Sequence, residues 1–255
     1  MAPQAGSLFH LGERIALVTG AAGGIGRAAA ESLAAAGATV ALLDIDPSVR
    51  EVAAALSGGC DRHLTLVADL LAPGAAEAAV RDVVGRCGRL DILVNNAGIA
   101  LLDPAQTLSE DAWDRTMALN LKAPFLLAQA AGREMIRRGY GRIVNLASQA
   151  SVVALERHVA YCASKAAIVG MTKVLALEWA KHGITVNAVS PTVVETELGR
   201  KAWAGAVGKA MKLKIPAGRF ARPDEIGALI LYLASDAAAM VNGENIVIDG
   251  GYTAQ

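Results

Sequence analysis

Seven short runs of β-branched and aliphatic residues recur along the chain, separated by longer alanine-rich segments. The runs are "RIALVTG", "ATVALLD", "LTLVAD", "LDILVNNAG", "GRIVNLAS", "ITVNAVSP" and "ENIVIDGG". They are apolar at consecutive positions, which is typical of strands that are buried on both faces. Because helix-length segments separate them, the pattern predicts an α/β fold with a doubly wound, seven-stranded parallel sheet flanked by helices.

The alanine-rich segments carry the periodicity and end signals of helices. We expect one helix over 25–36 and two long ones over 109–138 and 155–181. Helix ends and first turns are marked by Gly37, Pro73, Ser109 with the acidic Glu110 and Asp111, and Pro223. The long helices have more apolar surface than one sheet face would cover, which favours a homotetramer or dimer.

One stretch departs from the alternation of strands and helices. Residues 191–220 lie between the last two strands, contain scattered glycine and proline, and include an amphipathic piece around Leu198 to Met211. An excursion of this length in a compact domain is typical of a substrate lid. Since no linker divides the chain, we expect one domain over 1–255.

Composition restricts the partners. The chain has 24 basic and 24 acidic residues, and hydrophobic residues make up 54% of it, so neither nucleic acid nor an anionic membrane is indicated. The first twenty residues lack the features of a signal peptide. Cys60, Cys87 and Cys162 have no zinc or disulfide spacing, which favours reduced thiols in a cytoplasm. No metal site is predicted, and none is assigned near Gln255. The partners expected are small molecules and other copies of the chain.

The segment "ALVTGAAGGIGRA" predicts a strand, a glycine-rich turn and a helix start. Gly20 would allow the tight turn, Gly24 would let a pyrophosphate approach the backbone, and Gly26 would let the helix pack on the sheet. A glycine pattern alone is also compatible with an ordinary loop that begins a helix. Arg27 follows the last glycine and is expected to point along the helix.

Asp44 strengthens the nucleotide interpretation because it closes the next strand, where a carboxylate can bind both adenosine ribose hydroxyls. A 2′-phosphate would be repelled there, and neither Ile45 nor Gly23 supplies a cation. The cofactor predicted is therefore NAD rather than NADP. Asp69 could accept from the adenine amino group, or it could be a turn residue. "NNAG" at 95–98 could pass close to the adenosine, or it could be a simple turn.

"SQASVVALERHVAYCASK", residues 148–165, contains two pairs of side chains four residues apart. His158 and Cys162 could form a nucleophile with its base, but no third group orients them. A Ser148 hydrolase would need a nucleophile elbow, which "LASQA" is not. Tyr161 and Lys165 could instead form an acid/base with its cation. Free tyrosine has a pKa of about 10, and a neighbouring ammonium is expected to lower it.

Taken in order along the chain, these motifs resemble the classical short-chain dehydrogenase/reductase family over essentially the full length. The resemblance covers "TGAAGGIG" at 19–26, Asp69, "NNAG" at 95–98 and the Tyr-x-x-x-Lys motif, whereas Thr192 stands where many members have glycine. It implies a Rossmann fold. It also implies a catalytic set of Asn120, Ser148, Tyr161 and Lys165, with Asn120 holding a water that relays protons from Lys165.

The cofactor contacts expected from the motifs and the resemblance lie at the ends of the predicted strands. They are Gly20, Gly24, Ile25, Gly26, Asp44, Ile45, Asp69, Leu70, Asn96, Ala97, Gly98, Tyr161, Lys165, Pro191, Val194 and Thr196. Residues expected to touch substrate surround Tyr161. They are Ser148, Gln149, His158, Tyr161, Glu195 and Trp203, with Glu156 as a further candidate.

Within the family, residues 146–180 and 190–205 resemble the polyol and sugar-alcohol branch, near threitol, galactitol and vicinal-diol dehydrogenases. The function expected is NAD-dependent interconversion of a secondary alcohol and its ketone, with Tyr161 as the acid/base. Two alternatives stay open. One is a 3-oxoacyl-carrier-protein reductase or other carbonyl reductase, and the other is a protein that binds NAD without turnover.

Overall fold

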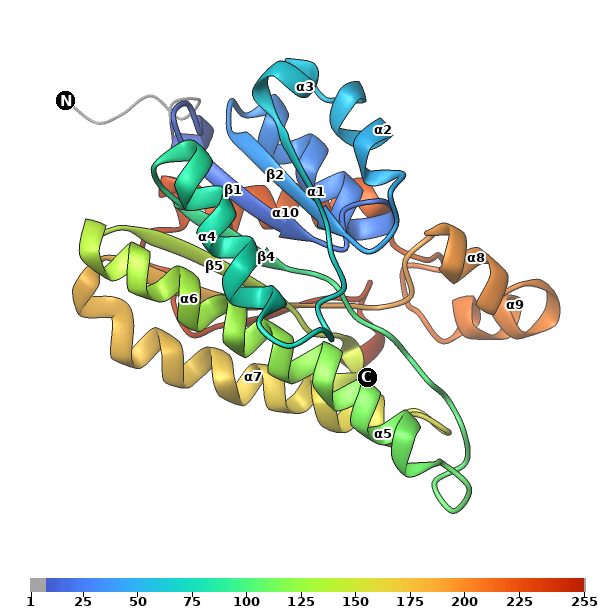
Figure 1. The fold of residues 1–255 in the computed structure, drawn as a ribbon. Coiled ribbons are helices and arrows are strands. Elements are labelled where there is room, and N and C mark those ends of the chain that lie inside the picture. The colour runs from blue at the N-terminus through green and yellow to red at the C-terminus, as the bar shows by residue number, and fades with distance from the viewer. Residues whose placement is uncertain (1–7, 255) are drawn as a thin grey trace.

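A single parallel sheet runs through the computed structural model, which describes residues 8–254 (Figure 1). Residues 1–7, Gln255 and the side chains of Leu198, Lys201 and Ala202 lie outside the described part. Expectations for the chain start, for Gln255 and for the side chain of Leu198 therefore stay predictions. The strand order is β3-β2-β1-β4-β5-β6-β7 and every pairing is parallel. The strands are β1 Ile15–Thr19, β2 Thr39–Asp44, β3 Leu64–Val67, β4 Ile92–Asn95, β5 Gly141–Leu146, β6 Ile184–Pro191 and β7 Asn245–Ile248.

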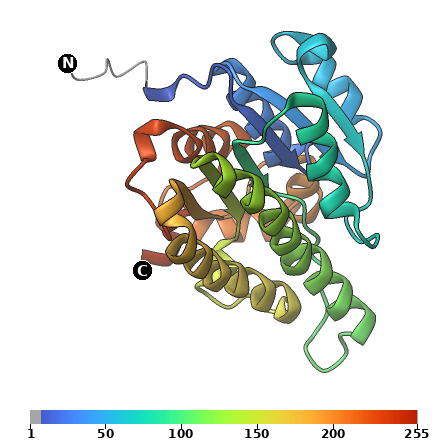
Figure 2. The ribbon, with the colours of Figure 1, turned by 60° about the vertical axis from the view of Figure 1, so that its left-hand side comes forward.

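Helices cover both faces of this sheet (Figures 1 and 2). They are α1 Gly24–Ala35, α2 Val49–Ala55, α3 Gly59–Arg62, α4 Ala75–Cys87, α5 Glu110–Met117, α6 Ala123–Arg138, α7 Val159–Trp179, α8 Glu197–Ala202, α9 Gly205–Leu213 and α10 Pro223–Ala234. Shorter pieces are the π-helix η2 Ala118–Lys122 and the 3-10 helices η3 Gln149–Ser151, η4 Ala180–His182, η5 Asp236–Ala238 and η6 Tyr252–Ala254. The predicted α/β fold class is confirmed.

The consecutive apolar positions in each strand divide between two cores. Ala16 and Val18 of β1 face the cluster formed with α1 and α10, whereas Leu17 faces the cluster formed with α4, α6 and α7. Successive side chains on a strand point to opposite faces, so a strand covered on both sides must be apolar throughout. The unbroken apolar runs of the sequence are therefore explained by helices on both faces.

Several helix predictions differ from the structure in where the helix begins, ends or is interrupted. The helix expected over 155–181 begins only at Val159, because Arg157 has a φ of 66° in the left-handed region, and α7 ends at Trp179. The helix expected over 109–138 is interrupted by η2. Pro73 lies in a turn and α4 starts at Ala75, whereas Pro223 does open α10. Ser109 caps α5 by accepting from the Ala112 N–H, as expected.

Within the described residues, one helical stretch, Val159–His182, is long and apolar enough to cross a membrane by length and composition. Its inner side packs on the sheet: Ile168, Leu175 and Ala176 belong to the core clusters, and Lys165 is buried along it. Core helices of globular proteins meet the same criterion, and packing on the sheet accounts for the apolar composition.

Candidate active site

The strand order places a crevice at the carboxyl edge of the sheet, between β1 and β4. From β1 the chain proceeds outward through β2 and β3, then returns to β4 on the other side and continues outward through β7. Loops that leave β1 and β4 therefore diverge. Crevices at such a switch point are where doubly wound sheets bind their ligands.

The glycine-rich turn after β1 requires glycine at two of its positions, 20 and 26. Gly20 has a φ of 66°, and a Cβ at Gly20 would lie 2.8 Å from Asn96 Nδ2. A Cβ at Gly26 would lie 2.0 Å from the Gly20 carbonyl oxygen. Both contacts are closer than atoms can approach, so the turn and the close packing of α1 require glycine at these positions.

The amino end of α1 is open toward the crevice. Its N-cap is Gly23, no side chain caps it, and its first turn holds no acidic residue. The first N–H groups of a helix have no partner inside the helix, and together with the helix dipole they attract anions. The geometry fits the pyrophosphate of a dinucleotide, as expected for Gly24 and Ile25. Thr196 lies beside it, since a Cβ at Gly24 would be 3.0 Å from Thr196 Cγ2.

Asp44 closes β2 beside the glycine turn. Its Oδ2 accepts from the Ala22 N–H at 2.9 Å, and its Oδ1 accepts from the Asp46 N–H at 3.0 Å. These bonds hold the carboxylate at the crevice, next to the 65% exposed Ile45. Asp69 is exposed after β3 and accepts from the Leu71 N–H at 2.8 Å, which is the turn arrangement considered as its alternative.

Thr19 and Asn96 join the turn after β1 to the end of β4. The Thr19 hydroxyl accepts from the N–H groups of Asn96 and Ala97, both at 3.0 Å. In return, Asn96 Nδ2 donates to the carbonyls of Thr19 and Gly20. Sequence reasoning missed Thr19, although a buried threonine directly before a glycine turn is a usable signal. The side chain of Asn96 thus holds the turn after β1 against the end of β4.

Tyr161 and Ser148 meet at the end of β5. The Ser148 side chain lies near the Tyr161 hydroxyl. Ser148 is 8% exposed and extended (φ −170°, ψ 159°), and its Oγ accepts from the Ala150 N–H at 3.2 Å. Burial raises the pKa of Tyr161 above its usual value, and the nearby Ser148 side chain lowers it by a smaller amount. The pKa lowering expected from the sequence is therefore absent in the protein alone.

Lys165 is buried one turn along α7 from Tyr161. Its Nζ donates to the Leu146 carbonyl at 2.6 Å and lies 5.6 Å from the centre of the Tyr161 ring. Burial lowers the pKa of Lys165 to about 8. The bond to the end of β5 directs the ammonium toward Gly98, where a Cβ would lie 3.6 Å from Nζ.

Asn120 lies in η2, and its side chain bonds outside the helix. Oδ1 accepts from the Ile99 N–H at 2.8 Å, and Nδ2 donates to the Ile99 carbonyl at 2.8 Å. Nδ2 also donates to Ser164 Oγ at 3.2 Å. The backbone carbonyl of Asn120 lacks the usual donor four residues on, because that residue is Pro124, which has no N–H. Asn120 thus fixes the loop after β4, and its carbonyl receives no bond from the residue four positions on.

The other pair of the 148–165 segment, His158 and Cys162, has no third side chain that orients it among the described residues. His158 Nδ1 is bonded to the Glu156 carbonyl, and its ring lies edge-on to Tyr161 with centres 6.1 Å apart. Cys162 is linked to His158 through the backbone, its N–H donating to the His158 carbonyl at 2.7 Å. The described residues contain no group of three or more His, Cys, Asp or Glu side chains that could hold a metal ion.

The predicted lid is formed by α8 and α9, which stand to one side of the sheet in Figure 1. Its two ends are joined, since Glu195 N donates to the Ala221 carbonyl and Ala221 N donates to the Val193 carbonyl. Met211, Ile215 and Phe220 form a separate small core there. The Trp203 ring packs edge-on against Phe220, with centres 6.3 Å apart.

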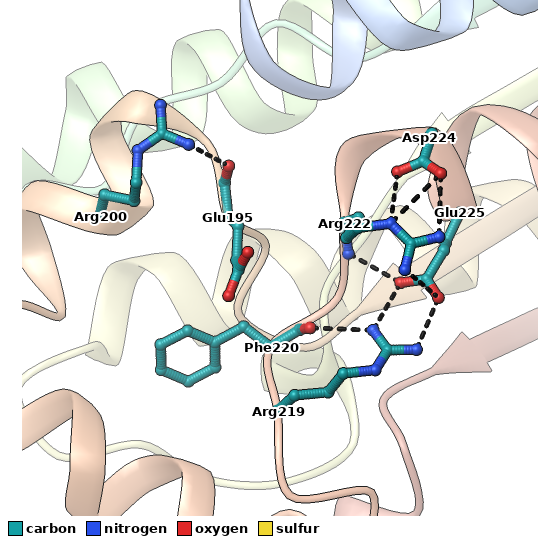
Figure 3. Close-up of polar contacts among 7 residues, drawn as sticks. All are labelled: Glu195, Arg200, Arg219, Phe220, Arg222, Asp224 and Glu225. Atoms are coloured by element: carbon teal, nitrogen blue, oxygen red, sulfur yellow. Dashed lines mark hydrogen bonds and ion pairs between the residues drawn. The ribbon is translucent and has the colours of Figure 1, made fainter.

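Charged groups hold the base of this segment to α10 (Figure 3). Arg219 donates to both carboxylate oxygens of Glu225, at 2.6 and 2.8 Å, while Glu225 accepts from the Arg222 N–H. Arg200 donates to the Glu195 carbonyl at 3.0 Å. The Glu195 carboxylate itself pairs with Lys212 at 3.6 Å. The Glu195 carboxylate, expected to touch substrate, is thus paired with a lysine.

The known proteins that this chain resembles are dehydrogenases and reductases. Residues 20–253 match the family model described as enoyl-(acyl carrier protein) reductase. An NAD-dependent glycerol dehydrogenase from Listeria innocua is 56% identical, covering 96% of each chain, and a D-threitol dehydrogenase from Mycolicibacterium smegmatis is 54% identical, covering 96% of this chain and 95% of its own. A gluconate 5-dehydrogenase from Burkholderia cenocepacia, solved with NADP and tartrate, is 36% identical, with a TM-score of 0.93 over 99% of this chain and 100% of its own.

Proposed function

The chain belongs to the short-chain dehydrogenase/reductase family, and from that premise we propose that it is an NAD-dependent dehydrogenase of polyols or vicinal diols. It interconverts a secondary alcohol and its ketone by hydride transfer. The observation that carries the proposal is the grouping of Tyr161 and Ser148 at the end of β5 with the buried Lys165, whose Nζ lies 5.6 Å from the centre of the Tyr161 ring. Relatives named for glycerol and D-threitol support the substrate class.

Tyr161 is the acid/base in this proposal. When bound, NAD supplies the hydride acceptor and a positive charge on its oxidised ring. Ser148 holds the substrate oxygen beside the phenol, and the Tyr161 phenolate takes the hydroxyl proton while hydride leaves the carbon. Because burial raises the pKa of Tyr161, the phenolate needs cations near it, and Lys165 is the one that the chain supplies.

Lys165 and Asn120 return the proton to solvent. Both side chains approach Gly98, with Asn120 Oδ1 at 3.0 Å and Lys165 Nζ at 3.6 Å from the position of a Cβ there. A pKa of about 8 lets Lys165 exchange a proton near neutral pH. The carbonyl of Asn120, which cannot receive a bond from Pro124, is suited to hold a water in this path.

Cofactor choice rests on Asp44. Its carboxylate is held at the crevice by the N–H groups of Ala22 and Asp46, so it can accept from ribose hydroxyls and would repel a 2′-phosphate. The remaining contacts are assigned to the strand-end residues given above, including Pro191, Val194 and Thr196. The NADP in the gluconate dehydrogenase is that protein's ligand.

Substrate contacts are assigned to Gln149, His158 and Trp203. Gln149 is 2% exposed next to Ser148, and His158 lies against the Tyr161 ring. Trp203 is part of the lid core and could close over the substrate. Glu195 contributes only if its ion pair with Lys212 opens, because that pair occupies its carboxylate.

A spectrophotometric screen tests the function. The purified protein is assayed at 340 nm with NAD and NADP over glycerol, threitol and butane-2,3-diol, and with NADH and NADPH over an acetoacetyl thioester. We expect NADH formation from at least one polyol and a preference for NAD. Thioester reduction with NADPH and no polyol oxidation would establish the carbonyl reductase alternative. NAD binding without any turnover would establish a non-catalytic NAD-binding protein.

We also propose that the protein is a cytoplasmic homotetramer, or a dimer. An exposed groove between α5, α6 and α7 supports the assembly. It is lined by Asp114, Met117, Ala118, Leu121, Lys122, Phe125 and Met171. On the outer side of α7, Val174 and Leu177 are 54% and 83% exposed, which is unusual for large apolar side chains on a helix that packs on a sheet. The three cysteines are free thiols, which supports a reducing compartment.

A further inference from the structure

Two buried oxygen atoms at the carboxyl edge have no hydrogen-bond partner within the described protein. They are Gln149 Oε1 and Thr192 Oγ1, on side chains that are 2% and 8% exposed. Buried polar atoms are nearly always hydrogen-bonded in native proteins, and leaving one unpaired costs about 1–3 kcal/mol. Other such atoms of the described residues, Asn95 Oδ1, Arg142 Nε and Thr185 Oγ1, belong to residues within the strands.

The two residues come from neighbouring segments just beyond the ends of β5 and β6. Leu146 of β5 pairs with Val189 of β6, and Ala147 N still donates to the Val189 carbonyl at 2.8 Å. Ser148 is extended, and η3 begins at Gln149. Ser151 Oγ of η3 lies 3.1 Å from Ser190 Oγ of β6, so η3 packs against the end of β6, two residues before Thr192.

Both residues follow positions that face α7. Asn145 donates to Thr172 of α7, and Ala147 packs with Ile168 of α7 directly before Ser148 and Gln149. Ala188 of β6 joins that cluster, and Thr192 lies four residues further on. Tyr161 and Lys165 come from the same helix, and Ser148 is adjacent to Gln149.

We propose that Thr192, together with Gln149, binds the hydroxyl on the carbon next to the reacting carbinol and so selects vicinal diols. The inference rests on the proposed dehydrogenase function and deepens it. A hydroxyl can donate to Gln149 Oε1 and accept from Thr192 Oγ1 at once, which satisfies both buried atoms. A simple alcohol leaves them unpaired, and sites built to bind a hydroxyl reject analogues that lack it.

The first test compares Thr192→Val with Thr192→Ser on butane-2,3-diol and butan-2-ol, which differ by one hydroxyl. The ratio of kcat/KM for the diol to kcat/KM for the alcohol should fall roughly 10- to 100-fold in T192V, as expected for one lost hydrogen bond, and stay near wild type in T192S. Because valine has the shape of threonine without an unpaired hydroxyl, the Tm of T192V should equal or exceed that of wild type.

Two outcomes would overturn the assignment: an unchanged ratio, with or without equal losses on both substrates, or a weakened NADH Kd, which would place the hydroxyl on the cofactor. If the wild-type protein oxidises no diol with NAD, the proposed function itself is wrong. The wild-type assay therefore separates failure of the proposed function from failure of the Thr192 assignment. Gln149→Leu provides a second variant. If both side chains bind one hydroxyl, the double variant should lose little more of the ratio than the worse single variant. Independent, multiplying losses would contradict a shared hydroxyl.

Discussion

Tyr161 and Lys165 lie one helical turn apart, and burial moves their pKa values in opposite directions. The pKa of Tyr161 is raised and that of Lys165 is lowered to about 8, so burial favours the neutral form of each. Without cofactor, the Lys165 ammonium therefore does not bring the Tyr161 pKa below its usual value. In the proposed mechanism, the positively charged ring of the oxidised cofactor would supply the further stabilisation that the phenolate needs.

Replacing Tyr161 with Phe removes the group assigned to proton transfer and keeps the aromatic ring. We expect alcohol oxidation to fall about 10²- to 10⁴-fold, the range for loss of general acid–base catalysis. The NADH Kd, measured by fluorescence titration, should stay within about threefold, since the hydroxyl lies beside Ser148 and not at the glycine turn. Retained turnover in Y161F would refute the acid/base assignment.

Lys165 makes stability depend on pH in a defined direction. Its folded pKa is about 8 against 10.5 for a free side chain, so between these values the unfolded chain binds more protons. The free energy of unfolding should therefore rise as pH increases from about 8 to about 10.5, by at most about 3 kcal/mol. Urea titrations at pH 7.5 and 9.5 measure this.

Lys165→Met should lose that rise in stability, and Lys173→Met should keep it because Lys173 is exposed on the same helix. K165M leaves the Leu146 carbonyl without its donor, which partly offsets the relief of a buried charge. An equal pH slope in wild type and K165M would show that Lys165 is not desolvated in the native state.

At the scale of elements, the π-helix η2 is what presents Asn120 to the site. The N–H of Ala123 bonds to the Ala118 carbonyl five residues back, and Pro124 has no N–H to give to Asn120. Single π-helical turns inside α-helices are frequent at functional sites. The sequence shows a proline near this point, but the periodicity of 109–138 is that of one continuous helix.

Pro124→Ala gives back a backbone N–H four residues after Asn120. We expect this donor to occupy the Asn120 carbonyl and lower kcat about tenfold, within the range for impaired proton transfer, with an unchanged NADH Kd. Pro73→Ala, in the turn before α4, serves as the control and should leave kcat unaltered. If P124A turns over at the wild-type rate, the carbonyl has no part in the proton path.

Glu225 anchors the end of the lid segment to α10. Its hydrogen bonds to Arg219 and the Arg222 N–H lower its pKa to about 2. A lowered carboxylate pKa adds stability above its unfolded pKa of 4.5 and loses it as pH falls toward 2. Glu225→Gln should lower the free energy of unfolding at pH 7 by about 1 kcal/mol, a small value because the pair is partly exposed.

The difference between wild type and E225Q should vanish between pH 4.5 and pH 2, as measured by thermal unfolding. Asp224→Asn is the matched control, since Asp224 is exposed and its side chain pairs with Arg222. Its effect should be smaller than that of E225Q, because exposed ion pairs contribute little to stability. An E225Q deficit that persists at pH 2 would indicate lost packing instead of lost charge.

For the whole molecule, the outer side of α7 is the surface expected to join copies of the chain. Leu177→Glu places a charge there and should reduce the mass measured by sedimentation velocity, because burying an unpaired charge opposes association. Leu213→Glu is the control, since Leu213 is 89% exposed on α9, away from that face. Unchanged mass in L177E would place the interface elsewhere.

Much of this molecule could be predicted from local pattern. Seven apolar runs became seven parallel strands because burial on both faces demands apolar side chains at every position. The glycines at 20 and 26 and the carboxylate at 44 stand where short-range geometry requires them, so their crevice could be anticipated. The spacing of Tyr161 and Lys165 likewise follows from the helix repeat.

Only the tertiary structure decided what surrounds those side chains. Burial by distant segments sets the pKa directions of Tyr161 and Lys165, and no spacing contains that information. The start of α7 at Val159 depends on the left-handed backbone at Arg157, and Glu195 pairs with Lys212 of α9. Gln149 and Thr192, about forty residues apart in the chain, are brought near each other because η3 packs against the end of β6, and such a long-range contact cannot be read from local pattern.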